Sequence, residues 1–217
     1  MGHAKLLLVS ASPRRRALIE RLGLAVELAS GDVDERVRSG EGAVAAARRL
    51  ALAKVRTAPT AGLRVAGDTV VVSPDGQRIL GKPADVGEAE AMLRELRGRT
   101  HSVVTGVAVV CGDLELVAHS ETRVTMRRFT DGELDAYVRS GSPLDKAGAY
   151  GIQDEWFLPV ASLAGCYWNV VGLPLCLVAR LLTEAGVVLP PSPYRERTCD
   201  CGDEARLHQS GDLHPAG

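Results

Sequence analysis

The stretch LLLVSASPRRR, residues 6–16, decides how the fold begins. Its apolar run predicts a buried strand, and Pro13 at a first helical position predicts a helix directly after it, an order typical of α/β folds. The serine hydroxyls, the free N–H groups of the helix start and three arginines together suggest an anion site. Arginines in a first turn oppose the helix dipole, so a polyphosphate ligand is one reason for them. A solvated basic helix start is the alternative.

The rest of the chain alternates between helical and strand patterns. We expect a mixed, twisted sheet flanked by helices, with two lobes and a central cleft, and therefore the α/β class. The domain is expected to span 1–189, and residues 190–217 are expected to form a flexible C-terminal tail. The predicted elements are strands at 26–29, 64–72, 101–110, 114–128, 156–163 and 167–171, and helices at 13–22, 42–56, 85–96, 130–138 and 174–182.

Composition narrows the function classes. The chain has 217 residues, 46% of them hydrophobic, and a net charge of −1, so no overall field attracts it to nucleic acid or a membrane. The longest late apolar stretch is interrupted by Pro174 and Arg180, which argues against a membrane span. Five cysteines, an odd number without a framework, indicate a reducing compartment. We expect a soluble, cytoplasmic protein with no nucleic-acid or membrane partner.

Scattered polar residues have the types that a triphosphate site needs. Neither a GxxxxGK[ST] loop nor a GxGxxG turn is present, so a P-loop or Rossmann site is not indicated. Only four of the 26 basic residues are lysines, which suggests that a lysine within a dense motif is there for its compact ammonium. Each candidate alone also fits a solvated surface position. The candidate cations are Arg14, Arg15, Lys54 and Lys82, and the candidate metal-binding carboxylates are Glu35 and Asp68.

Separated motifs in a fixed order make the chain resemble the Maf family of nucleoside triphosphate pyrophosphatases, over most of residues 4–186. The resemblance implies a two-lobed α/β fold with the site in the cleft. It also implies hydrolysis of a nucleoside triphosphate between its α- and β-phosphates, with a divalent cation such as Mg, Mn or Co. The motifs are SASPRRRALIERLGL from residue 10, DVDE at 32–35, LALAK ending at 54, GDTVV at 67–71, ILGKP at 79–83, LRGRTHSVVTGVAVV at 96–110, PLDKAGAYGIQ at 143–153 and VVGLPL at 170–175.

The resemblance also implies a role for individual residues. It makes Asp68 the catalytic proton acceptor and gives Glu35, with Asp68, a part in holding the metal. Substrate choice is expected to depend on Arg14, Thr69 and Gln153, in a combination that resembles the dTTP/UTP type and extends to modified pyrimidine triphosphates. A glutamine amide can both donate to and accept from a pyrimidine edge, although Gln153 could also be a loop residue that bonds backbone. The implied triphosphate ligands are Ser10, Arg14, Arg15, Lys54 and Lys82.

Several points stay open at this level. Asp154, Glu155 and Trp156 replace a turn that usually contains glycine in the family, and they either alter base selectivity or point outward. Gly67 stands where alanine is common, which could loosen its strand. Alternative functions are a non-catalytic nucleotide-binding regulator of septum formation, or the same enzyme acting on 7-methyl-GTP or another purine triphosphate. A homodimer is neither indicated nor excluded.

Three further groups are candidates for other roles. His101 opens a predicted strand and is expected to be structural, because the implied mechanism does not need it. Trp156 and Trp168 are expected at the core or rim rather than as base-stacking platforms. In the tail, Cys199 and Cys201, with two histidines, contain the atoms of a zinc site, but CxC is not the usual zinc-knuckle spacing.

Overall fold

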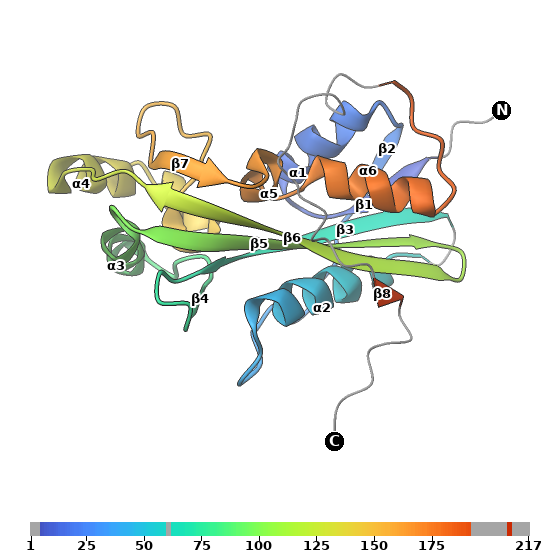
Figure 1. The fold of residues 1–217 in the computed structure, drawn as a ribbon, viewed down its shortest axis with the longest axis horizontal. Helices are drawn as coiled ribbons and strands as arrows, with labels where there is room; N and C mark the ends of the chain where they lie inside the picture. Colours follow the sequence, from blue (N-terminus) through green and yellow to red (C-terminus); the bar gives the residue numbers. More distant parts are fainter. Residues whose placement is uncertain (1–4, 60–61, 192–207, 210–217) are drawn as a thin grey trace.

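Eight strands form one mixed sheet with helices on both faces (Figure 1). The computed structural model describes residues 5–59, 62–191 and 208–209. The helices are α1 (Pro13–Ile19), α2 (Ala43–Arg56), α3 (Val86–Leu96), α4 (Asp131–Arg139), α5 (Tyr167–Val171) and α6 (Leu175–Glu184), with 3-10 segments η1 (Glu20–Leu22), η2 (Ser142–Asp145) and η3 (Ala147–Ala149). The strands are β1 (Leu6–Val9), β2 (Val26–Ala29), β3 (Leu63–Val72), β4 (Ile79–Leu80), β5 (Thr100–Cys111), β6 (Leu114–Met126), β7 (Val160–Ala164) and β8 (His208–Gln209).

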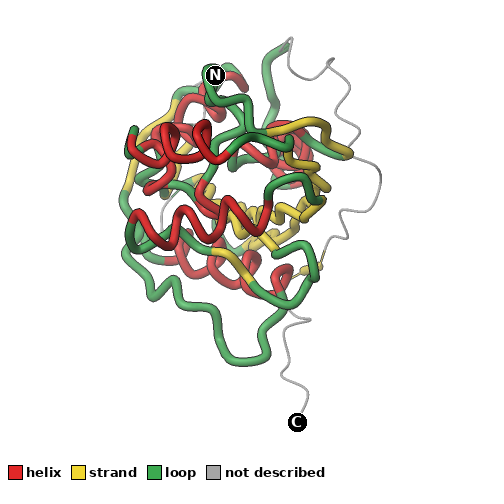
Figure 2. The backbone as a smooth tube through the Cα atoms, turned by 90° about the vertical axis from the view of Figure 1, so that its left-hand side faces the viewer, coloured by secondary structure: helices red, strands yellow, loops and turns green. Residues whose placement is uncertain are grey.

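The sheet combines a parallel part with a long antiparallel part. Its strand order is β2-β1-β3-β5-β6-β7, with β4 paired to β3 and β8 to β6. β1 pairs in parallel with both β2 and β3, and the remaining pairs are antiparallel. In the perpendicular view, strands run through the middle of the molecule with helices above and below them (Figure 2). The mixed α/β sheet flanked by helices confirms the predicted fold class.

Successive side chains of β3 and β5 point to opposite faces of the sheet. Val65 and Val107 face a core that contains residues of α1 and α6, whereas Ala66 and Ala108 pack with residues of α2 on the other face. The helix comes very close to the sheet at Gly106, where an added Cβ would lie 2.2 Å from the Ala47 carbonyl oxygen. Small residues on this face therefore bring α2, and the side chains it carries, close to β3.

A second hydrophobic core lies at the other end of the long strands. It joins α3 and α4 to the far ends of β3, β5 and β6, and its largest fully buried side chains include Tyr137 and Phe157. α1 and α6 lie over one half of the sheet, and α3 and α4 lie at the opposite end (Figure 1). The expected two lobes are thus two cores built on one continuous sheet.

Local signals explain most element boundaries. Ser12 caps α1 by accepting from the Arg15 N–H, and Thr130 with Glu133 forms a capping box at the start of α4. The prediction for 167–171 was wrong, because this segment is helix α5 rather than a strand. The buried Asn169 explains the difference: its amide donates to the Val103 carbonyl oxygen and to Thr122 Oγ1, both at 2.9 Å.

The outer regions match the predictions in part. The strand predicted at 156–163 begins only at Val160. Of the expected flexible tail, residues 208–209 pair with β6 as β8, and 192–207 and 210–217 lie outside the described residues. In the described part of the chain, none of the helices is long and apolar enough to cross a membrane.

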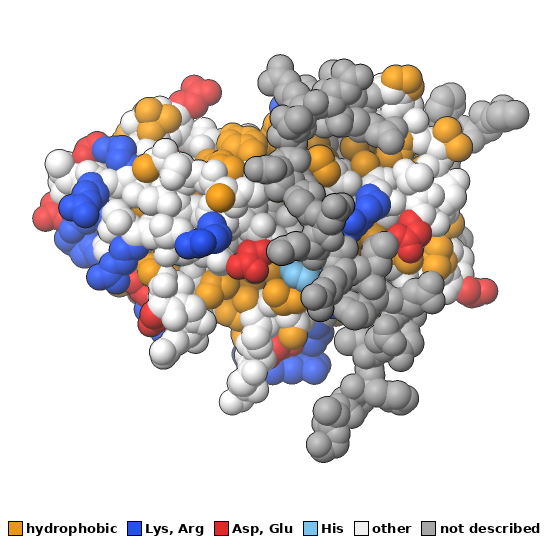
Figure 3. Space-filling model, viewed as in Figure 1, with side chains coloured by type: hydrophobic (Ala, Val, Ile, Leu, Met, Phe, Trp, Pro, Cys, Tyr) orange, Lys and Arg blue, Asp and Glu red, His pale blue; other side chains and the backbone are white. Residues whose placement is uncertain are grey.

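Basic side chains gather at the end of the molecule that carries α3 and α4 (Figure 3). Several of them are paired: Arg94 and Arg97 both reach Asp131, at 2.9 and 2.7 Å, and Arg127 lies 2.9 Å from Glu133. These are surface pairs, which contribute little stability individually.

Candidate active site

Two adjoining cavities bring the predicted site residues together. The first, about 380 Å³, is lined by Ser10, Glu35, Lys54 and Asp68, and we call it the carboxylate cavity. The second, about 290 Å³, is lined by Gln153 among others, and we call it the Gln153 cavity. The lining residues common to both are Ser12, Arg14, Arg15, Thr69, Lys82, Asp145 and Ala147. Every residue predicted from the sequence for substrate, metal or catalysis therefore lies in one continuous site.

Lys54 links two carboxylates in the carboxylate cavity. Its Nζ, near the end of α2, lies 2.5 Å from Asp68 Oδ1 on β3 and 2.5 Å from Glu35 Oε1 on the loop before α2. The Lys54 and Asp68 side chains are only 8% and 10% exposed, whereas that of Glu35 is 56% exposed. The close packing of α2 on the sheet explains how a helix lysine reaches a strand aspartate. Lys54 is the counter-charge of the nearly buried Asp68 carboxylate, as buried ionic groups require, and the exposed Glu35 leaves the cluster with one carboxylate in excess.

The electrostatic surroundings keep Glu35 ionised. Partial burial acts to raise its pKa, but the hydrogen bond and charge of Lys54, with the nearby charges of Lys82 and Arg15, outweigh burial and lower the pKa. Glu35 is therefore an anion at neutral pH. It is available as a ligand for a cation or as a partner for Lys54.

The two carboxylates fit a hard divalent cation whose remaining ligands would come from substrate and water. Glu35 and Asp68 each place an oxygen 2.5 Å from the same nitrogen, so both can approach a common point. Among the described residues, no cluster of three or more histidine, cysteine or acidic side chains could hold a metal. Mg²⁺ is commonly bound by one or two carboxylates together with water and substrate phosphates. The two carboxylates match that pattern better than that of a closed protein cage.

The arginines that follow Pro13 separate into different roles. Arg15 is held in the cleft, where Nε donates to the Gly172 carbonyl oxygen at 2.9 Å and Nη2 to Thr69 Oγ1 at 3.1 Å. Arg16 is exposed and pairs with Glu20 one helical turn later, as expected of a solvated residue. Arg14 lines both cavities.

The serine and threonine hydroxyls are partly engaged within the protein. Ser10 Oγ accepts from the Ser12 N–H at 3.1 Å, and Ser12 Oγ caps the helix. Thr69 Oγ1 lies 2.9 Å from Thr105 Oγ1 in addition to its contact with Arg15. Thr69 therefore orients Arg15, a role that was not predicted from the sequence.

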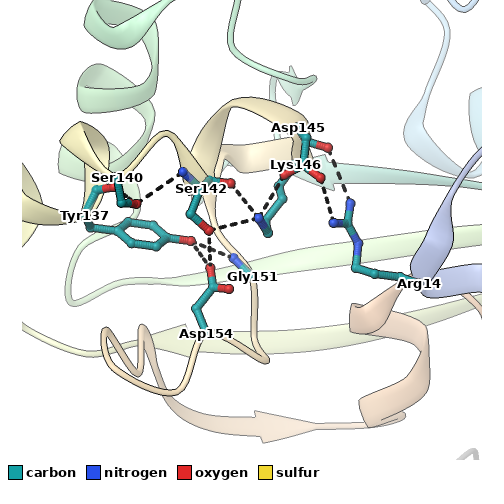
Figure 4. Close-up of polar contacts among 8 residues, drawn as sticks. All are labelled: Arg14, Tyr137, Ser140, Ser142, Asp145, Lys146, Gly151 and Asp154. Atoms are coloured by element: carbon teal, nitrogen blue, oxygen red, sulfur yellow. Dashed lines mark hydrogen bonds and ion pairs between the residues drawn. The ribbon is translucent and has the colours of Figure 1, made fainter. Parts of the chain in front are cut away.

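Arg14 forms a bridge across the cleft to a residue 131 positions away. Its Nη1 donates to Asp145 Oδ2 at 2.8 Å, and Lys146 Nζ lies 2.8 Å from the other oxygen of the same carboxylate (Figure 4). Asp145 was not among the predicted site residues, although PLDKAGAYGIQ was recognised as a motif. The sequence did mark this position, because Asp145 stands next to Lys146, one of only four lysines. Nothing in the neighbouring sequence indicates that Asp145 pairs with Arg14.

The structure shows how Asp154, Glu155 and Trp156, which follow Gln153, are oriented. Gln153 is exposed and lines the Gln153 cavity. Asp154 is half-buried and also lines this cavity, but its carboxylate bonds the hydroxyls of Tyr137 and Ser142 (Figure 4). Glu155 and Trp156 are exposed, the tryptophan at 59%, and neither lines the two cavities, so Trp156 is not in the core. One acid of the pair therefore serves the interior, and the other faces outward.

His101 lies beneath the Gln153 cavity rather than in it. It is 3% exposed, and its Nε2 is 2.8 Å from the hydroxyl of Tyr150, which lines the cavity. Burial lowers the pKa of His101 to about 4. The residue is structural, as predicted. The possible zinc ligands Cys199, Cys201 and the tail histidines have side chains outside the described residues.

Comparisons with known proteins agree with this geometry. The family model described as "Maf-like protein" matches residues 5–185. A protein of Moorella thermoacetica named dTTP/UTP pyrophosphatase is 48% identical over 189 residues, which cover 85% of this chain and 96% of the relative. Proteins with the same name from Symbiobacterium thermophilum and Chromobacterium violaceum are each 45% identical, over 84% and 86% of this chain and 94% and 97% of the relatives.

Proposed function

The chain belongs to the Maf family, and from that premise we propose that it is a nucleoside triphosphate pyrophosphatase that acts on dTTP and UTP. It hydrolyses the bond between the α- and β-phosphates and releases the monophosphate and pyrophosphate. The observation that carries the proposal is the Asp68–Lys54–Glu35 cluster, which faces the same cavity as Arg14, Arg15 and Lys82. The relatives' names supply the substrate pair.

Asp68 is the group best placed to accept a proton from the attacking water. It lines the carboxylate cavity with its side chain nearly buried, and Lys54 keeps one carboxylate oxygen in place. The water attacks the α-phosphorus, its proton passes to Asp68, and the α–β bridging oxygen leaves with the electron pair of the broken bond.

Cations on both walls of the cleft bind the phosphates. Arg15 is fixed by Gly172 and Thr69, so its guanidinium is oriented before substrate arrives. Lys82, just after β4, lines both cavities and lies on the far side of the hairpin from Asp68. Such preorganised charges stabilise the negative charge that develops on the leaving pyrophosphate.

We propose that Glu35 and Asp68 hold a divalent cation, Mg²⁺, Mn²⁺ or Co²⁺, when triphosphate is bound. The cation neutralises phosphate oxygens. Lys54 takes the place between the two carboxylates in this structure, and its flexible stem would let the ammonium move toward a phosphate if a cation occupied that place. The donor set of two carboxylates supports this proposal, since the remaining ligand positions are left to substrate and water.

Base selection is assigned to the Gln153 cavity. The Gln153 amide can donate to a carbonyl oxygen and accept from the N–H of uracil or thymine, which present both groups on one edge. Because this side chain is exposed while it lines the cavity, the site leaves room for substituents on the base. We therefore include modified pyrimidine triphosphates among the substrates.

A cytoplasmic setting completes the proposal. The described cysteines, Cys111, Cys166 and Cys176, are all free thiols, as is usual in a reducing compartment. Burial raises the pKa of Cys166 to about 11, so its thiol stays neutral and behaves as a small core residue. The nucleotide pool on which such an enzyme acts is found in that compartment.

A substrate panel tests the proposal directly. Purified protein is incubated with dTTP, UTP, CTP, dATP, GTP and 7-methyl-GTP, each with Mg²⁺, Mn²⁺ or Co²⁺, and the products are separated by ion-exchange chromatography. We expect equal amounts of pyrophosphate and monophosphate from dTTP and UTP. Release of orthophosphate and the nucleoside diphosphate would contradict the cleavage site, and a preference for 7-methyl-GTP would contradict the base assignment. Binding without turnover would support a regulator instead.

A further inference from the structure

The turn that carries Gln153 is fastened to the protein by the residue that follows it. Asp154 Oδ2 accepts hydrogen bonds from the Tyr137 hydroxyl and from Ser142 Oγ, the latter at 3.3 Å (Figure 4). The Asp154 N–H donates to the Gly151 carbonyl oxygen at 3.1 Å, which closes the turn through the backbone. Gln153 therefore lies between two residues whose positions are fixed.

Tyr137 is a rigid anchor for this turn. It projects from α4 into the second core with no exposed surface, and its ring stacks on Phe157 at a centroid distance of 4.0 Å and an interplanar angle of 11°. Its hydroxyl also accepts from the Gly151 N–H at 3.1 Å. One phenol thus bonds both ends of the turn, Gly151 through its backbone and Asp154 through its carboxylate.

The backbone around the turn is held in conformations that need such support. An added Cβ at Gly151 would lie 2.8 Å from Asp154 Oδ2, so the carboxylate packs directly on the glycine. The only non-glycine residues with positive φ in the described chain are Ala149 at 61° and Leu158 at 47°, on either side of the turn. Strained residues of this kind persist where the surrounding contacts hold them.

We propose that Asp154 is a positioning residue for base selection. With Tyr137 it fixes the turn so that the Gln153 amide meets the carbonyl and N–H edge of a uracil or thymine base in one orientation. Without that constraint the amide can present either its oxygen or its nitrogen, and discrimination between pyrimidines decreases. The inference rests on the proposed function and gives Asp154 a role that acts through the position of Gln153, because its carboxylate oxygen is bonded to Tyr137 and Ser142.

Kinetics of matched variants test this role. Asp154→Ala and Tyr137→Phe each remove the hydrogen bond between the Tyr137 hydroxyl and the Asp154 carboxylate, which we call the clamp. Asp154→Asn keeps an acceptor oxygen for this bond. Glu155→Gln is the control, because it alters the adjacent acid that faces solvent. We expect the first two to raise KM for UTP about tenfold and to lower the preference for UTP over CTP to a similar degree, with kcat changed less than about twofold. The double variant should be no worse than either single one, because both remove the same constraint. Glu155→Gln should match the wild type.

Amide hydrogen exchange gives a readout that does not depend on activity. Exchange in a peptide covering residues 147–156 should be faster in Asp154→Ala and Tyr137→Phe and unchanged in Glu155→Gln. If Asp154→Ala does not fold, Tyr137→Phe and Asp154→Asn carry the test. Unchanged KM and preference despite faster exchange would overturn the inference, and so would a uniform loss of kcat on every nucleotide that follows a lowered Tm.

The test separates this inference from the proposed function. If the wild type cleaves none of the triphosphates, the proposed function fails and the inference fails with it. If the wild type cleaves UTP and both clamp variants retain its KM and its preference over CTP, only the inference is contradicted.

Discussion

In the carboxylate cavity, Asp68 projects from a central strand and Lys54 from the helix packed on it, whereas Gln153 lies on a turn that one tyrosine and one aspartate hold in place. The first region places the nearly buried Asp68 and Lys54 on a strand and a helix, with the exposed Glu35 beside them on a loop. The second is built from irregular backbone with an exposed glutamine. Under the proposed function, reaction chemistry and base preference therefore rest on differently built parts of the molecule, which are joined by lining residues such as Arg14 and Thr69.

Asp68→Asn should have the largest effect. The amide keeps the shape of the side chain but cannot accept a proton, so we expect kcat to fall about a thousandfold on every substrate, with UTP preference retained. Steady-state assays on UTP and dTTP measure the loss, and circular dichroism tests whether the fold persists. Asp113→Asn, in the exposed β5–β6 turn, is the matched control. Undiminished turnover by Asp68→Asn would refute the role of this residue.

Gln153→Glu should affect the other region and leave the first intact. The carboxylate cannot donate a hydrogen bond and is repelled by the phosphates, so kcat/KM for UTP should fall about thirtyfold and that for CTP less. The matched control is Gln77→Glu, which makes the same change at the exposed turn between β3 and β4. An equal loss on all bases would place Gln153 with the general binding residues instead.

Glu35→Gln should weaken metal binding in the carboxylate cavity without changing base preference. The amide is a weaker ligand for a hard cation, so the Mg²⁺ or Mn²⁺ concentration that gives half-maximal rate should rise about tenfold, while base preference stays constant. Titration of each metal into the EDTA-treated protein measures this concentration. Glu121→Gln, on exposed β6 surface, is the control. An unchanged metal requirement would mean that Glu35 serves only as a partner for Lys54.

His101→Gln should have the smallest effect at neutral pH, where we expect activity close to that of the wild type. Because burial lowers the folded-state pKa of His101 from 6.5 to about 4, the unfolded chain takes up its proton first as the pH falls. The wild type should therefore lose about 3 kcal/mol of stability from this group between pH 6.5 and pH 4. Above pH 6.5 that contribution is fully present.

Denaturant unfolding at pH 8, 6, 5 and 4 measures the difference between the two proteins. The stability of His101→Gln should decline less than that of the wild type over the acid range, since glutamine does not titrate. Parallel declines in both proteins would show that His101 is not the responsible group.

Regular elements and charged site residues could largely be predicted from the sequence. The strand before Pro13 and the cap at Thr130 are local signals, and both hold in the structure. The prediction for YWNVV failed because its aromatic and β-branched residues favour a strand, whereas in the folded chain the segment is a helix whose buried Asn169 bonds β5 and β6. A tertiary contact of this kind has no signal in the segment itself.

The long-range partners within the site could not be predicted for the same reason. Arg14 meets Asp145 only after the two cores have assembled on the sheet. Whether Asp154 or Glu155 bonds within the protein depends on the position of Tyr137, which lies on α4, far from this turn in the sequence. The motifs identified which residues gather, but the network that orients them is a property of the folded chain.

Gly106 controls the geometry of the site as well as the packing of α2 on the sheet. In the β3–β5 ladder Gly106 is the direct partner of Asp68, and it is also where the backbone of α2 comes closest to the sheet. A methyl group there would push the helix away and withdraw Lys54 from the aspartate. Gly106 therefore sets the distance between Lys54 and Asp68. Saturation mutagenesis should find this position nearly as intolerant of substitution as Asp68, although it has no side chain that could contact a substrate.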